Sequence, residues 1–255
     1  MTMAAPSTSS VSAVWWQLPA PPLRGRVILA AGLGCVAVFG LGLVVQSQFS
    51  TTSMQPLTAT AAFAVWMAIA IGAMRHHHPF VRFGPANHVT MARGMLVWLS
   101  ASMIAEPVGS PVAWALVAAT VMVVALDGVD GWLARRTRMN SAFGARFDME
   151  TDAFFMLVLS VLVWRHHKAG LWVLGIGLMR YAFVAAGWVL PWLSRPLRST
   201  PRGKAAAMAQ LAGLGIALVP LVPMPISTIV SATALATLAW SFAIDVRFLW
   251  VTRPD

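Results

Sequence analysis

The chain has 255 residues, of which 58% are hydrophobic and only 10% are charged, and its mean hydropathy is +0.74. Because soluble domains carry about 25% charged residues, this composition excludes an ordinary soluble protein and indicates an integral membrane protein. The formal net charge of +10 does not indicate a nucleic-acid partner, because the basic residues lie in short loops between apolar segments.

The expected elements are an N-terminal tail and a series of membrane-spanning helices. The tail, residues 1–26, is rich in Pro, Ser and Ala and lacks the apolar content of a packed segment. A helix needs about 20 apolar residues to cross a bilayer, and Pro220, Pro223 and Pro225 divide the long uncharged stretch 205–244 into two such helices. The sequence therefore predicts an all-α polytopic transmembrane bundle of about eight helices, at 27–47, 57–74, 88–105, 109–126, 152–166, 170–193, 204–221 and 226–246.

The basic residues predict the orientation of these helices. With the N-terminus in the cytoplasm, Arg165 and Lys168 are the only basic loop residues on the opposite side. The cytoplasmic side then has fourteen: Arg24, Arg26, Arg75, Arg82, Arg135, Arg136, Arg138, Arg146, Arg195, Arg198, Arg202, Lys204, Arg247 and Arg253. Because cytoplasmic loops are enriched in Lys and Arg, we expect both termini in the cytoplasm, in a plasma or inner membrane of bacterial type.

Acidic residues are concentrated around the connection between the fourth and fifth predicted helices. Five of the eight acidic residues lie within 26 positions: Asp127, Asp130, Asp148, Glu150 and Asp152. The separations of three residues (127 to 130) and four residues (148 to 152) place each pair of aspartates on one face of a helix. Carboxylates near hydrocarbon are costly, so this spacing favours a functional site at the cytoplasmic membrane boundary over a merely solvated acidic turn.

The residue types predict a site for divalent metal and phosphate. Carboxylate oxygens are hard ligands that favour Mg²⁺, Mn²⁺ or Ca²⁺ over zinc. Four carboxylates can hold two ions about 4 Å apart, an arrangement that suits displacement at phosphorus. Gly131 and Gly144 would let a phosphate or nucleotide approach the backbone, and Arg135 offers a forked cation for phosphate oxygens.

The spacing of these residues resembles the signature of the CDP-alcohol phosphatidyltransferase family. All eight signature positions match, in the pattern Asp127-x2-Asp130-Gly131-x2-Ala134-Arg135-x8-Gly144-x3-Asp148-x3-Asp152. The resemblance covers residues 77–255 and implies a six-helix catalytic core there and a homodimer. Residues 27–76 would be two additional spans, to which the sequence assigns no role.

The resemblance also implies roles for the signature residues. Asp127, Asp130, Asp148 and Asp152 resemble the ligands of two Mg²⁺ or Mn²⁺ ions, and Asp152 also resembles the catalytic general base. The positions that resemble contacts to the CDP group are Gly131, Ala134, Arg135 and Gly144.

The implied reaction belongs to phospholipid biosynthesis. A phosphatidyl group would pass from CDP-diacylglycerol to the hydroxyl of an alcohol, with release of CMP. Glycerol 3-phosphate is the preferred acceptor because the loop before the seventh helix is cationic, while inositol phosphate, serine and a lipid alcohol remain alternatives. A non-catalytic membrane protein that binds divalent cations is the alternative from another class. Acidic residues near the middle of the membrane and an internal pseudo-repeat would favour this non-catalytic alternative, and the sequence shows neither feature.

The segment 84–93 resembles the family's Pro-Asn-x-x-Thr-x-x-Arg entry to its first core helix, with Ala86 inserted. Asn87 and Thr90 are predicted to border the nucleotide. The alternatives are an N-cap for Asn87 and helix packing for Thr90. Arg93 is predicted to bind the acceptor or a phosphate, with snorkelling to the interface as the alternative.

Other basic residues are further candidates for binding the acceptor or a phosphate: Arg180, Arg195, Arg198 and Lys204. The alternative for Arg180 is a structural ion pair within the membrane, and for the other three it is ordinary cytoplasmic charge. The run His76-His77-His78 is predicted to contact lipid headgroups rather than a metal, because adjacent residues on a helix do not face one way.

Overall fold

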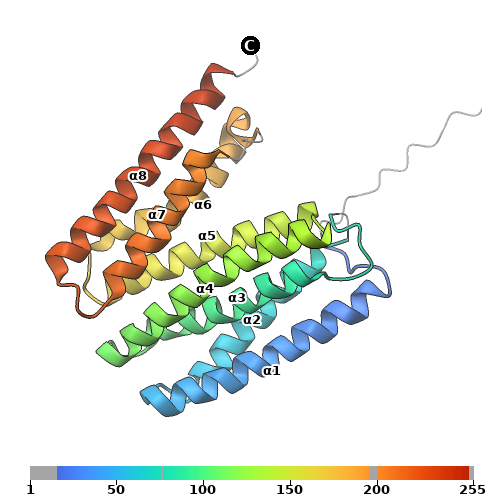
Figure 1. Cartoon of the computed structure of the whole chain (residues 1–255), viewed down its shortest axis with the longest axis horizontal. Coiled ribbons are helices and arrows are strands. Elements are labelled where there is room, and N and C mark those ends of the chain that lie inside the picture. Colours follow the sequence, from blue (N-terminus) through green and yellow to red (C-terminus); the bar gives the residue numbers. More distant parts are fainter. Residues whose placement is uncertain (1–15, 76, 196–199, 253–255) are drawn as a thin grey trace, which may run out of the picture.

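The computed structural model describes residues 16–75, 77–195 and 200–252, and Figure 1 shows them as a bundle of helices. The predicted all-α fold is confirmed. Within these residues the helices are α1 (Leu23–Phe49), α2 (Gln55–Gly72), α3 (Pro85–Ser102), α4 (Ser110–Thr137), α5 (Ala142–Arg165), α6 (Leu174–Val189), α7 (Pro201–Leu218) and α8 (Met224–Val251). A short 3₁₀ segment at 103–105 follows α3, and two others, at 171–173 and 191–194, precede and follow α6.

Five helical segments of the described chain are long and apolar enough to cross a membrane: α1, α2, α4, α8 and residues 171–189, which include α6. The chain is therefore an integral membrane protein. Helices α3, α5 and α7 are more polar, since α3 has Arg93, α5 has two of the aspartates and α7 begins with Arg202 and Lys204. The helices that fall short of an independent span thus all carry predicted site residues, and so do α4 and α6 among the apolar segments.

Helices α4 and α5 both extend beyond the predicted spans. Helix α4 continues to Thr137, and Arg135 and Arg136 lie in its last turn, where cations interact favourably with the helix dipole. Helix α5 begins at Ala142 because the Ser141 side chain accepts a hydrogen bond from the Gly144 N–H (3.0 Å) and caps the helix. The connection is only residues 138–141, so all four aspartates lie inside helices.

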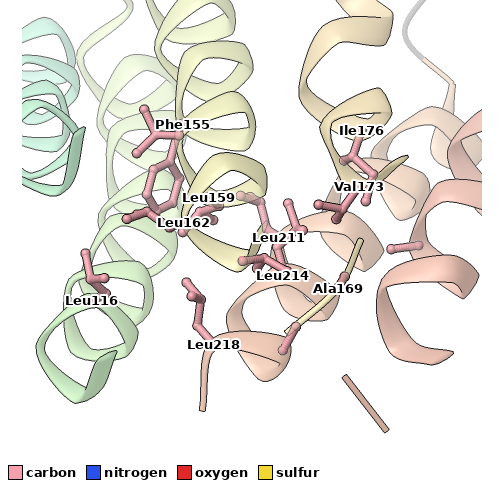
Figure 2. Close-up of a cluster of buried hydrophobic side chains, with 14 of the residues drawn as sticks. Leu116, Phe155, Leu159, Leu162, Ala169, Val173, Ile176, Leu211, Leu214 and Leu218 are labelled. Carbon is pink, nitrogen blue, oxygen red and sulfur yellow. The ribbon is translucent and has the colours of Figure 1, made fainter. Parts of the chain in front are cut away.

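Two hydrophobic clusters hold the helices together. One joins α4, α5 and α7 through residues that include Leu116, Phe155, Leu159, Leu211 and Leu214 (Figure 2). The other joins α1, α2, α3 and the start of α5 through residues that include Val27, Phe63, Met67, Met91 and Phe147. Helix α5 belongs to both clusters, which fixes the part of it that carries Asp148 and Asp152.

The two N-terminal helices are also tied to the rest of the chain by a buried carboxylate. Glu106, 3% exposed, lies in the connection between α3 and α4. Its carboxylate accepts hydrogen bonds from the Thr52 backbone N–H (2.9 Å) and from the Thr52 hydroxyl (2.7 Å). These bonds satisfy the buried charge and join the α1–α2 loop to the core at the end of the bundle opposite the α4–α5 turn.

Candidate metal and nucleotide site

The predicted acidic cluster forms around one arginine. Asp127 and Asp130 extend from α4, and Asp148 and Asp152 from α5, toward the guanidinium of Arg93 on α3. Arg93 Nη1 lies 2.6 Å from Asp130 Oδ2 and 2.5 Å from Asp148 Oδ1. Arg93 Nη2 lies 2.8 Å from Asp127 Oδ1 and also contacts Asp152 Oδ1. The three helices therefore meet at a single cluster of charges.

The burial of Arg93 excludes one of the two interpretations of this residue, and binding of the acceptor or a phosphate by Arg93 stays a prediction. Its side chain is 0% exposed, so the snorkelling alternative is wrong. A buried guanidinium is tolerated when carboxylates pair with it, and here four of them do so. The four carboxylates outnumber the single guanidinium, so whenever more than one of them is ionised the cluster retains a negative charge that favours a further cation.

Three of the four aspartates are placed as a metal site requires. One oxygen each of Asp127, Asp148 and Asp152 can be chosen so that all lie within 4.8 Å of one another. Oxygen ligands at this separation suit Mg²⁺ or Mn²⁺, and the guanidinium of Arg93 contacts all three of these carboxylates. Asp130 is more enclosed, at 6% exposed, and accepts a hydrogen bond from the Thr90 hydroxyl (3.2 Å) as well as pairing with Arg93.

A cavity of about 220 Å³ lies beside the aspartates. Asp130 and Asp148 form part of its wall. All six residues predicted to contact the nucleotide line it: Asn87, Thr90, Gly131, Ala134, Arg135 and Gly144. Residues from three helices thus surround one space next to the acidic cluster.

Gly144 leaves room for the Asn87 side chain where α5 approaches α3 at this cavity. A Cβ atom at Gly144 would lie 2.9 Å from Asn87 Oδ1, closer than van der Waals contact allows. Asn87 itself lies in the first turn of α3 and donates a hydrogen bond from Nδ2 to the Phe83 carbonyl oxygen (2.5 Å). Because α3 begins at Pro85 with Gly84 as its N-cap, the N-cap alternative for Asn87 is wrong.

Among the described residues, the remaining basic candidates do not line the cavity. Arg180 donates to Glu150 Oε1 (2.8 Å), the ion pair that was its alternative role. Arg195 is exposed and donates to the Thr252 carbonyl oxygen. Lys204 is exposed in the first turn of α7, and Arg198 lies outside the described residues. A role for these residues in binding the acceptor stays a prediction.

Some residues at the site were not predicted from the sequence. The cavity is also lined by Ala86, Met139, Asn140, Ser141 and Ala145. Ser141 could have been found, because a serine three residues before Gly144 at the start of an apolar run is typical of a helix N-cap.

His78 is buried at 7% exposed and lies 3.0 Å from Ser141 Oγ, so the prediction that the histidine run contacts lipid headgroups is wrong for His78. His76 lies outside the described residues.

Comparison with known proteins agrees with the signature. A family model described as CDP-alcohol phosphatidyltransferase matches residues 83–244, which is more than half of the chain. The match includes α3 to α7, most of α8, and every residue of the acidic cluster. No curated protein and no solved structure matches the chain.

Proposed function

Because the chain belongs to the CDP-alcohol phosphatidyltransferase family, we propose that it transfers the phosphatidyl group of CDP-diacylglycerol to an alcohol and releases CMP. The observation that carries this proposal is the meeting of the α4 and α5 aspartates beside a cavity lined by all six predicted nucleotide contacts. The matched residues 83–244 fall within the catalytic core proposed at 77–255.

We infer that the aspartates hold two Mg²⁺ or Mn²⁺ ions. Asp127, Asp148 and Asp152 offer oxygens close together, and Asp130 stands beside them. When bound, divalent ions neutralise the pyrophosphate of the donor and stabilise the departing CMP. Arg93 occupies the centre of the same cluster, so its guanidinium must share the carboxylates with the ions or withdraw from some of them.

The chain's own groups can position the donor. Arg135, at the exposed end of α4, can pair with phosphate oxygens. Gly131 and Gly144 present backbone without a side chain to the cavity, and Asn87 and Thr90 add polar groups from α3. The diacylglycerol part of the donor would stay in the bilayer while its nucleotide enters the cavity.

Asp152 is proposed as the general base. It would accept the proton of the acceptor hydroxyl, whose oxygen forms a bond to the phosphorus that carries diacylglycerol. The bond between that phosphorus and the bridging oxygen breaks, and CMP leaves with the electron pair. The Asp152 side chain is 29% exposed, so an acceptor can reach it, in contrast to the enclosed Asp130.

The site is proposed to face the cytoplasm of a bacterial-type plasma membrane, with both termini on the same side. The start of α1, the α4–α5 turn, the start of α7 and the end of α8 all lie toward one end of the bundle (Figure 1). That end also has the basic loops, which supports a cytoplasmic location. Assembly as a homodimer is part of the proposal by family resemblance.

Glycerol 3-phosphate is the proposed acceptor. The first turn of α7 presents the exposed Lys204, and Arg195 is exposed in the preceding segment, so an anionic acceptor would meet positive charge near the membrane surface. Inositol phosphate is anionic as well, whereas serine and a lipid alcohol would draw less benefit from these side chains.

The test is CMP release by the purified full-length protein in detergent with CDP-diacylglycerol, Mg²⁺ or Mn²⁺, and a panel of alcohols. We expect release that requires one acceptor and is abolished by EDTA. No release with any acceptor, in protein that still binds Mn²⁺, would contradict the transferase and favour a non-catalytic cation-binding protein.

A further inference from the structure

The helix α2, which precedes the matched family region, contacts the part of α5 that carries the site. The Trp66 indole stacks on the Phe147 ring, with centroids 4.8 Å apart and an interplanar angle of 23°. Phe147 is buried and directly precedes Asp148. A side chain from outside the matched region therefore supports the backbone from which a proposed metal ligand extends.

The same indole also contacts α3. A Cβ atom at Gly94 would overlap the Trp66 ring, so this glycine is what allows α2 to come so close. Gly94 directly follows Arg93. Trp66 thus packs against Gly94 and Phe147, which adjoin Arg93 and Asp148 in the chain. The side chains of Arg93 and Asp148 lie 2.5 Å apart.

The linker after α2 makes a second contact with the start of α5. His78 Nε2 donates to the Arg82 carbonyl oxygen (2.8 Å), which in a neutral ring leaves Nδ1 to accept from the Ser141 hydroxyl (3.0 Å). Ser141 in turn accepts from the Gly144 N–H. The Phe143 backbone N–H also donates to the His77 carbonyl oxygen (3.0 Å).

We propose that α2 and its linker set the position of α5 relative to α3, with Trp66 positioning Asp148 and His78 positioning Ser141 and Gly144. This inference rests on the proposed function, and it gives α2, one of the two additional N-terminal helices, a role at the site. Neither residue lines the cavity or belongs to the acidic cluster. Groups that orient metal ligands in this way change metal affinity and activity without entering the reaction.

The first experiment compares Trp66→Ala with Val65→Ala in the full-length protein. Val65→Ala is the matched control, because Val65 is the adjacent residue of α2 and its side chain is 61% exposed. Mn²⁺ binding is read from the rise in melting temperature with Mn²⁺ concentration, and kcat and KM from CMP release. We expect Trp66→Ala to need about tenfold more Mn²⁺ for half-saturation, and Val65→Ala to need the wild-type concentration. Trp66→Phe keeps a ring that can stack on Phe147, and should reach half-saturation at close to the wild-type Mn²⁺ concentration.

The second variant is His78→Ala, which keeps the experiment decisive if Trp66→Ala does not fold. Loss of the Ser141 contact should raise KM for CDP-diacylglycerol by about two- to tenfold, the range expected from one net hydrogen bond, and leave Mn²⁺ half-saturation unchanged. If the variants only lower the melting temperature, with wild-type Mn²⁺ response and KM, the positioning role is overturned while the proposed function stands. A wild-type protein without Mn²⁺-dependent stabilisation or CMP release would overturn both.

Discussion

Arg93 Nη1 lies 2.6 Å from Asp130 Oδ2, and both side chains are almost completely enclosed, at 0% and 6% exposed. This pair joins α3 to α4 at the point where α5 also arrives with Asp148 and Asp152. The acidic cluster therefore has a built-in counter-charge, and metal binding and the stability of the helix bundle are linked through it.

Removing that counter-charge should destabilise the protein when no metal is present. Arg93→Ala leaves four carboxylates facing one another, and loss of one partner from a buried ion pair costs about 3–5 kcal/mol. We expect a lower melting temperature in EDTA and a larger rise on adding Mn²⁺ than in the wild type. Arg93→Lys keeps the positive charge but not the forked guanidinium, and should lower the melting temperature in EDTA by less than Arg93→Ala does. An unchanged melting temperature of Arg93→Ala in EDTA would contradict this account of the cluster.

Substitution of the proposed base should separate binding from turnover. Asp152→Asn keeps the size of the side chain but cannot accept the proton of the acceptor hydroxyl, so we expect CMP release to fall by at least about 100-fold. Donor binding and Mn²⁺-dependent stabilisation should persist, because the other aspartates remain. CMP release at the wild-type rate would rule out Asp152 as the base.

Gly144 should tolerate no side chain. In Gly144→Ala the new Cβ would lie 2.9 Å from Asn87 Oδ1, so either the Asn87 amide must leave its place at the cavity or α5 must move away from α3. A displacement of about 1 Å at such a site can cost up to about 100-fold in rate, and we expect kcat/KM for the donor to fall by about 10- to 100-fold. Gly40→Ala is the control, since no described atom lies within 4 Å of its Cβ. Equal activity of the two variants would refute the role of this glycine.

Lys204 tests the proposed acceptor. If it contacts the phosphate of glycerol 3-phosphate, Lys204→Ala should raise KM for that acceptor by about tenfold, as expected for a lost hydrogen bond to a charged group, with KM for the donor unchanged. Arg24→Ala provides a control, because Arg24 is an exposed basic residue at the start of α1. The same KM change in both variants would point to surface charge in general.

The sequence predicted the members of the acidic cluster better than the way in which they assemble. Helical spacing gave the shared faces of the aspartate pairs, and the structure brings both pairs to one point. The spacing did not reveal Arg93 as the centre of the cluster, because periodicity identifies a face but not the helix that lies opposite. Trp66 and His78 escaped prediction for a similar reason: their partners Phe147 and Ser141 lie 81 and 63 positions further along the chain.

The placement of Arg93 also has a consequence for how the protein enters the membrane during synthesis. All four acidic partners of Arg93 follow it in the chain, so α3 emerges before the groups that neutralise it. An unpaired arginine near the centre of a helix adds about 2.5–3.5 kcal/mol to the insertion free energy, and α3 does not belong to the segments apolar enough to insert alone. We therefore expect α3 to be integrated together with α4 as a helical hairpin, so that Asp127 and Asp130 accompany Arg93 into the bilayer.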